Sequence, residues 1–212
     1  MASALPPRLF VTGTDTDIGK TVVSAVLLAG TEGYYWKPVQ TGIIESSDTD
    51  WIREQTGLPE SHFFPETYRF QQPLSPHAAA ALEDAHISLD RFAMPVTPDT
   101  EVLIVEGAGG VLVPLNETHF MLDLMMKLAV PVLVVADSGL GTINHTLLSL
   151  ESLRRADLDI LGVVMNGPKN SGNRQAIETY GRVPVLAEIT PLDEITPRTL
   201  KGCFRRCFTE HR

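Results

Sequence analysis

RLFVTGTDTDIGKTVVSAVLLAG, residues 8–30, contains three local patterns in a row. RLFVT (8–12) is a short apolar run of β-forming residues and predicts a strand, whereas KTVVSAVLLAG (20–30) has the apolar spacing of a helix that ends at Gly30. The turn between them, GTDTDIGKT (13–21), carries glycines and a Gly-Lys-Thr triplet. A strand, a glycine-bearing turn and a helix in this order are the context of a phosphate-binding loop.

The loop is one residue longer than the common phosphate-binding pattern, but it keeps the groups needed to bind phosphate. Five residues separate Gly13 from Gly19, one more than in the common pattern. Backbone N–H groups of the turn and of the helix start create an anion site, and Gly19 allows close backbone approach. Lys20 then supplies charge near the outer phosphates, and Thr21 offers a hydroxyl to Mg²⁺. A chance Gly-Lys-Thr in a surface turn is the alternative, and the order of the flanking elements disfavours it.

The rest of the chain alternates apolar runs with helical patterns. Strands are expected at 34–39, 101–110, 130–139, 159–167 and 182–189, and helices at 48–57, 76–85, 120–128 and 143–156, with 58–76 as a loop. The strand candidates are almost continuously apolar, which is typical of strands buried on both faces. The sequence therefore predicts an α/β fold, with a predominantly parallel sheet flanked by helices on both faces, of P-loop NTPase type, as one domain over 1–212.

Charge and composition exclude several classes of protein. The net charge of −9 argues against a nucleic-acid partner, because a phosphate backbone requires a Lys/Arg surplus. The sequence has no apolar run of about 18 residues, so no membrane span is expected. The first residues lack the pattern of a secretory signal. We therefore expect a cytoplasmic protein with no membrane partner. Cys203 and Cys207 would lie on one face of a helix, as reduced thiols rather than metal ligands.

Further charged residues stand at or beyond the ends of predicted strands, where open α/β sheets bind ligands. Glu106 precedes three glycines in VEGAGG, and its carboxylate could reach a metal held by the loop threonine. Lys37 follows the second strand and could stabilise a transferring phosphoryl group. Asp48 and Asp50 could bind metal or merely cap the next helix. Taken singly, an acid such as Glu106 is usually a solvated turn residue, although its place between a buried strand and three glycines favours a functional role, and a lone lysine such as Lys37 is more often an exposed surface residue.

Together the motifs resemble the dethiobiotin synthetase family. The likeness is carried by GTDTDIGKT (13–21), KPVQTG (37–42), LSPH (74–77), VEGAGG (105–110), LGTINH (140–145) and MNGP (165–168). These motifs run in the family's order from the first strand to near the last. The resemblance implies a homodimeric ligase of biotin biosynthesis. Its reaction converts 7,8-diaminopelargonate, CO₂ and MgATP into dethiobiotin, ADP and phosphate. A carbamate and a carbamic–phosphoric anhydride are the implied intermediates.

The resemblance also implies roles for individual residues. Lys37 and Lys20 are the catalytic residues, and Thr21, Asp48 and Glu106 hold Mg²⁺, although Asp50 remains an alternative to Asp48. The nucleotide is bound by Asp17, Ile18, Gly19, Lys20, Thr21, Val22, Asp48, Glu106, Gly107, Ala108, Gly109, Asn166, Gly167, Thr190, Pro191 and Leu192. The substrate is bound by Thr16, Thr41, Leu140, Gly141, Thr142, Ile143 and Asn144, the last five as a helix N-terminus reaching across the subunit interface. On this basis, replacing Lys37 by alanine should leave the fold intact and depress turnover far more than ATP binding.

The sequence departs from the family at three positions. Asp17 stands where glutamate is common, Thr41 where serine is usual, and Gly167 where an acidic residue often follows the adenine-reading asparagine. Three other classes remain as alternatives. A ParA/MinD-like ATPase switch usually carries a lysine early in the loop, and residues 14–16 of this chain contain none. An amide ligase of corrin biosynthesis is usually longer than this chain. A nucleotide kinase usually has an arginine-rich lid, and this sequence shows no such segment.

Overall fold

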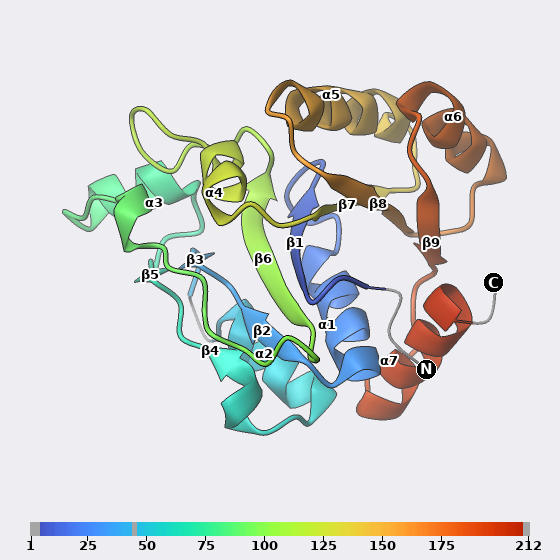
Figure 1. Cartoon of the computed structure of the whole chain (residues 1–212), viewed down its shortest axis with the longest axis horizontal. Helices are drawn as coiled ribbons and strands as arrows, with labels where there is room; N and C mark the ends of the chain where they lie inside the picture. The colour runs from blue at the N-terminus through green and yellow to red at the C-terminus, as the bar shows by residue number, and fades with distance from the viewer. Residues whose placement is uncertain (1–4, 44–45, 210–212) are drawn as a thin grey trace.

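The computed structural model describes residues 5–43 and 46–209, and its centre is a seven-stranded parallel sheet between layers of helices (Figure 1). In spatial order the strands are β4 (Phe63–Phe64), β2 (Tyr34–Trp36), β6 (Leu103–Gly110), β1 (Arg8–Gly13), β7 (Val132–Asp137), β8 (Ile160–Asn166) and β9 (Val185–Ile189). A separate parallel pair joins β3 (Val39–Gln40) to β5 (Tyr68–Arg69). The predicted parallel α/β architecture is confirmed.

Helices cover both faces of the sheet. One face carries α1 (Lys20–Thr31), α2 (Asp48–Thr56) and α7 (Pro197–Phe204), and the other carries α3 (Pro76–Leu82), α4 (Met121–Leu128), α5 (Thr142–Arg155) and α6 (Ser171–Gly181) (Figure 1). Shorter turns are 3-10 helices at Glu60–His62 and Leu89–Arg91 and a π-helical turn at Arg205–Thr209. Within the described ranges, no helix has the length and apolar character needed to cross a membrane.

Successive strand residues enter two different cores, which explains the unbroken apolar runs. In β1, Leu9 and Val11 pack under α1 and α7, whereas Phe10 packs on the α4 and α5 side. In β6, Ile104 packs in the core with Leu9 and Val11, and Leu103 packs in the core with Phe10. A strand that is buried on both faces must be apolar at every position rather than at every second one.

The second predicted strand is interrupted. Residues 34–39 are not one strand, because β2 ends at Trp36 and β3 begins at Val39 in the separate two-stranded sheet. Pro38 lies between them; it has no N–H to donate, and its carbonyl oxygen accepts hydrogen bonds from the N–H groups of Thr67 and Tyr68. The break turns the chain away from the main sheet immediately after Lys37.

Other boundaries also differ from the sequence-based expectation. The segment 58–76 is not all loop, since it contains β4 and β5, which are too short to show a periodic pattern. The helices α6 and α7 were not predicted. Helix α1 continues through Gly30 to Thr31, and the ring of Phe204 packs where a Cβ at position 30 would lie. As expected, Cys203 and Cys207 are free thiols on one side of a helical segment, with their sulfur atoms 3.9 Å apart.

Candidate active site

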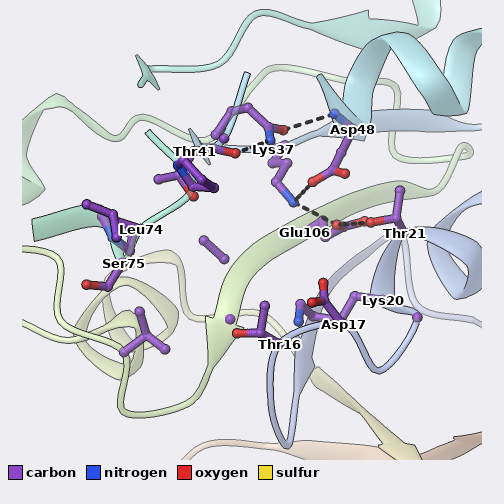
Figure 2. A pocket seen from close by; sticks show the side chains of 18 of the residues that line it. Thr16, Asp17, Lys20, Thr21, Lys37, Thr41, Asp48, Leu74, Ser75 and Glu106 are labelled. Carbon is purple, nitrogen blue, oxygen red and sulfur yellow. Dashed lines mark hydrogen bonds and ion pairs between the residues drawn. The ribbon is translucent and has the colours of Figure 1, made fainter. Parts of the chain in front are cut away.

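A cavity of about 780 Å³ opens at the carboxyl ends of β1, β2 and β6. It is lined by Thr16, Asp17, Gly19, Lys20, Thr21, Lys37, Gln40, Thr41, Gly42, Ser46, Asp48, Pro73, Leu74, Ser75, Pro76, Glu106, Ala108, Gly109 and Val113. Figure 2 shows the loop residues on one side of this space and the loop before α3 on the other. The position agrees with the rule that open α/β sheets bind ligands beyond their strand ends.

The glycine-bearing loop leads from β1 into α1, as predicted. Gly19 caps the helix in the left-handed region at φ 88°, which a residue with a Cβ rarely adopts. Asp17 is also left-handed, at φ 56°, and aspartate tolerates this conformation better than most residues. The Lys20 ammonium donates to the carbonyl oxygen of Asp15 at 2.8 Å, so the lysine folds back along the loop. These features bend the backbone around a concave space beside the cavity.

Three charged side chains meet at the base of the cavity. Trp36 pairs with Val105 across the parallel strands, so the following residues, Lys37 and Glu106, come side by side. The Lys37 ammonium donates to Glu106 Oε1 at 2.8 Å and forms an ion pair with Asp48 Oδ2 (Figure 2). The Thr21 hydroxyl donates to the same Glu106 oxygen at 3.1 Å. The site thus joins groups from the start of α1, from the residue after β2, from β6 and from the start of α2.

Burial and charge act against each other in this cluster. Burial alone would lower the pKa of Lys37, but the Glu106 and Asp48 carboxylates outweigh it and raise the pKa above its ordinary value. Burial likewise tends to raise the pKa of Asp48, and the Lys37 ammonium outweighs it, so that pKa is lowered. The pKa of Lys20 is lowered, mainly by burial. Lys37 is therefore held protonated between two carboxylates.

The oxygen atoms at this point fit a hard divalent cation. The Thr21 hydroxyl, the Asp48 carboxylate and the Glu106 carboxylate are the ligand types that Mg²⁺ prefers. Glu106 is fully buried, and its Oε2 atom has no hydrogen-bond partner among the described residues. A buried carboxylate with an unsatisfied oxygen needs a compensating partner. The donor set of Thr21, Asp48 and Glu106 is compatible with Mg²⁺.

Asp48 and Asp50 occupy different environments. Asp48 lines the cavity and pairs with Lys37. Asp50 instead completes the capping box of α2: its Oδ2 accepts from the N–H and hydroxyl of Ser47, and its Oδ1 pairs with Arg53. Of the two candidate metal ligands, only Asp48 faces the cavity.

Most of the predicted loop and charge-cluster residues come together, but several predicted positions lie elsewhere. Thr16, Asp17, Gly19, Lys20, Thr21, Lys37, Thr41, Asp48, Glu106, Ala108 and Gly109 line the cavity, whereas Ile18, Val22, Gly107, Asn166, Gly167, Pro191, Leu192 and 140–144 do not. Asn166 reaches the back of the loop, where its amide donates to the Ile18 carbonyl oxygen at 3.0 Å. Thr190 lines a second cavity, beside β9.

Sequence reasoning missed several residues of the cavity, namely Gln40, Gly42, Ser46, Pro73, Leu74, Ser75, Pro76 and Val113. Gln40 is buried; its Oε1 accepts from the Asp48 N–H at 3.1 Å and its Nε2 donates to the Thr41 carbonyl oxygen. It thereby fixes the start of α2 so that Asp48 faces Lys37. Leu74 and Ser75 form the opposite wall (Figure 2), and the neighbouring Pro76 also lines the cavity. Gln40, Gly42 and residues 74–76 belong to the quoted motifs KPVQTG and LSPH, which was the available signal. Ser46, Pro73 and Val113 belong to none of the quoted motifs.

Comparisons with known proteins agree with this geometry. A family model described as an AAA domain matches residues 7–199. The ATP-dependent dethiobiotin synthetase BioD of Paramagnetospirillum magneticum is 51% identical over 201 residues, covering 95% of this chain and 96% of that protein. The biotin biosynthesis bifunctional protein BioCD of Bordetella avium is 49% identical over 191 residues, 90% of this chain and 41% of that protein. A solved ParA family ATPase from Chlorobium tepidum has a TM-score of 0.55 at 12% identity, covering 94% and 89% of the two chains, and supports the P-loop fold alone.

Proposed function

This chain belongs to the ATP-dependent dethiobiotin synthetase family, and from that premise we propose that it carboxylates 7,8-diaminopelargonate and closes the ureido ring of dethiobiotin. It is an ATP- and Mg²⁺-dependent ligase of biotin biosynthesis. The observation that carries the finer proposal is the convergence of Lys37, Glu106 and Thr21 beside the loop, with a cavity that has room for a small substrate.

The proposed reaction has three bond-forming steps. One amine of the substrate attacks CO₂ and loses a proton, giving a carbamate. A carbamate oxygen attacks the γ-phosphorus of ATP, the bond to the bridging oxygen breaks, and ADP leaves. The second amine attacks the carbonyl carbon of the resulting carbamic–phosphoric anhydride, loses a proton, closes the ring and expels phosphate.

The lysines counter the charge repulsion in the middle step. A carbamate is an anion, and it must approach an anionic γ-phosphate. When bound, Mg²⁺ supplies positive charge that screens these oxygens. Thr21, Asp48 and Glu106 would hold that ion. The Lys37 ammonium, buried and held in place by two carboxylates, then faces the attacking and transferring groups. Lys20 adds a second charge from the loop side.

Asn166 and its neighbours are proposed to hold the base. An asparagine amide has two donor protons and an acceptor oxygen, so a bond to Ile18 leaves groups for the edge of adenine. Gly167 lies at φ 138°, and a Cβ there would come within 2.4 Å of Ser138 Oγ. In this chain a larger residue at position 167 would therefore require the Ser138 side chain to move. Thr190, Pro191 and Leu192, after β9, are proposed to flank the base from the other side.

The segment 140–144 is proposed to bind the substrate carboxylate of a second subunit in a homodimer. These residues form the start of α5 and lie outside the cavity of their own chain. Leu140 is fully exposed, and Leu148 of α5 and Tyr180 of α6 are exposed apolar side chains on neighbouring helices. A helix N-terminus favours an anion, and exposed apolar residues beside it favour a partner surface.

Replacement of Leu140 by aspartate is expected to shift the protein towards monomer and to raise the KM for the diamine more than that for ATP. The charge would enter the proposed interface beside the carboxylate site. Analytical ultracentrifugation and initial rates measure the two effects. Val96→Asp, which alters an exposed apolar side chain in a loop, is the control. A Leu140→Asp enzyme with unchanged mass and KM would contradict the interface proposal.

The proposed activity predicts ADP release that requires both 7,8-diaminopelargonate and bicarbonate. A coupled assay with MgATP measures it, and mass spectrometry detects dethiobiotin. Omitting the diamine or the bicarbonate is expected to abolish release, because the attacking carbamate cannot form. ADP release at the same rate without the diamine would instead indicate a switch ATPase of the ParA/MinD type.

A further inference from the structure

Tyr35 is a fully buried tyrosine next to the charge cluster that no role above explains. It lies in β2, with its ring packed edge-on against Phe63 at a centroid distance of 6.2 Å. Its hydroxyl oxygen has no hydrogen-bond partner among residues 5–43 and 46–209. Burying a hydroxyl without a partner costs free energy, so the group is not explained by the stability of the metal-free protein.

The strand register brings this hydroxyl to Glu106. Tyr35 pairs directly with Ile104, so their side chains share one face of the sheet, the face covered by α1. Glu106 is two residues beyond Ile104 and therefore lies on the same face. A tyrosine side chain is long enough to reach this diagonal neighbour across the strands.

The electrostatics agree with this placement. The pKa of Tyr35 is raised well above its ordinary value, first by burial and then by the Glu106 and Asp48 carboxylates and by interaction of the hydroxyl with Glu106. A tyrosine hydroxyl that faces a carboxylate can act towards it only as a donor.

The two oxygens of Glu106 have different surroundings. Oε1 accepts from Thr21 and Lys37 on the cavity side. Oε2 is buried and, in the described part of the chain, has no hydrogen-bond partner. The Tyr35 hydroxyl is an unpaired donor that interacts with Glu106, and Glu106 Oε2 is an unpaired acceptor.

We propose that Tyr35 is a positioning residue for the magnesium site, whose hydroxyl donates to Glu106 Oε2 and holds Oε1 towards the bound ion. Metal-binding carboxylates usually depend on such an outer hydrogen bond, and its loss typically costs 10–100-fold in metal affinity or activity. The inference rests on the proposed role of Glu106 as a metal ligand. It extends that role to a residue that does not line the cavity.

The test is a Tyr35→Phe substitution, which removes only the hydroxyl. We expect the Mg²⁺ concentration that half-saturates ADP binding to rise by about tenfold or more. Isothermal titration of ADP at a series of Mg²⁺ concentrations measures this without diamine or turnover. ADP affinity in EDTA should be unchanged, and the melting temperature of the ligand-free protein should not fall, because the lost hydroxyl has no partner there.

Tyr34→Phe is the matched control. Tyr34 is the preceding residue of β2, so its side chain points to the other face, where its ring stacks on His62 and its hydroxyl interacts with Glu101. An equal Mg²⁺ shift in both variants, no shift in Tyr35→Phe, or a loss of ligand-free stability specific to Tyr35→Phe would each overturn the inference. Diamine-dependent ADP release by the unmodified enzyme tests the proposed function separately, so the two can fail independently.

Discussion

Replacement of Lys37 by alanine is expected to lower turnover by about 10²–10³, the typical cost of one lost charged or hydrogen-bonding group in a transition state. The ammonium is buried and bound to two carboxylates, so its charge is held in place before the reaction begins. ATP affinity should change much less, because the loop amides and Lys20 remain. Single-turnover phosphate release and equilibrium ATP binding separate the two effects.

The Lys37→Ala variant is expected to keep its fold but to lose stability. Without Lys37, Asp48 and Glu106 face each other with no counter-charge in the ligand-free protein, and Glu106 is fully buried. Removing one partner of a buried ion pair costs about 3–5 kcal/mol, and the partial exposure of Asp48 favours the lower end. The melting temperature should therefore fall in EDTA and recover when Mg²⁺ and nucleotide are added.

Lys201→Ala is a suitable control for the Lys37 variant. Lys201 is an exposed lysine that pairs with Glu32 on the surface, and such pairs contribute about 0–1 kcal/mol. Its removal should leave turnover unchanged and stability nearly so. Normal turnover in Lys37→Ala would remove the basis of the proposed phosphoryl-transfer role.

Replacement of Gly19 by alanine is expected to weaken ATP binding by about tenfold or more. A Cβ at this position would lie 2.1 Å from the Asn166 amide nitrogen, and the backbone is left-handed at φ 88°. The left-handed conformation alone costs an alanine about 1–2 kcal/mol, and 1.4 kcal/mol corresponds to a factor of ten in affinity. The loop can relieve the strain only by leaving its wrapped conformation and moving the contact between Asn166 and Ile18.

Equilibrium binding of ATP to the Gly19→Ala protein measures this loss. Gly172→Ala is the control, because that glycine lies in α6, and an added Cβ there would meet only Asn170 Oδ1, at 3.6 Å. Alanine in a helix is more favourable than glycine by about 1 kcal/mol, so the control should be as stable as the parent or more so. Equal ATP affinities in the two variants would show that the loop does not need its glycine.

Features that depend on neighbouring residues could be predicted well. The turn between β1 and α1 is local, since its glycines, its lysine and its threonine act within nine consecutive residues, GTDTDIGKT (13–21). The unbroken apolar runs identified the long strands because a doubly covered strand must be apolar throughout. The short strands β4 and β5 were missed because long-range pairing rather than local pattern creates them.

The amino-acid sequence by itself determined the phosphate-binding loop, the parallel α/β class and, through its motifs, the family. Tertiary structure alone decided which charges meet: Lys37 and Glu106 are far apart in the chain and become neighbours only through the register of β2 against β6. The same register puts the side chains of Tyr35 and Glu106 on one face of the sheet. The hydrogen bond from the Asp48 N–H to Gln40 fixes the start of α2, where Asp48 lines the cavity. The physical reason is that loop conformation and helix capping depend on interactions between residues close in sequence. Charge pairing across a parallel sheet depends instead on the register of two strands, which the residues between them do not specify.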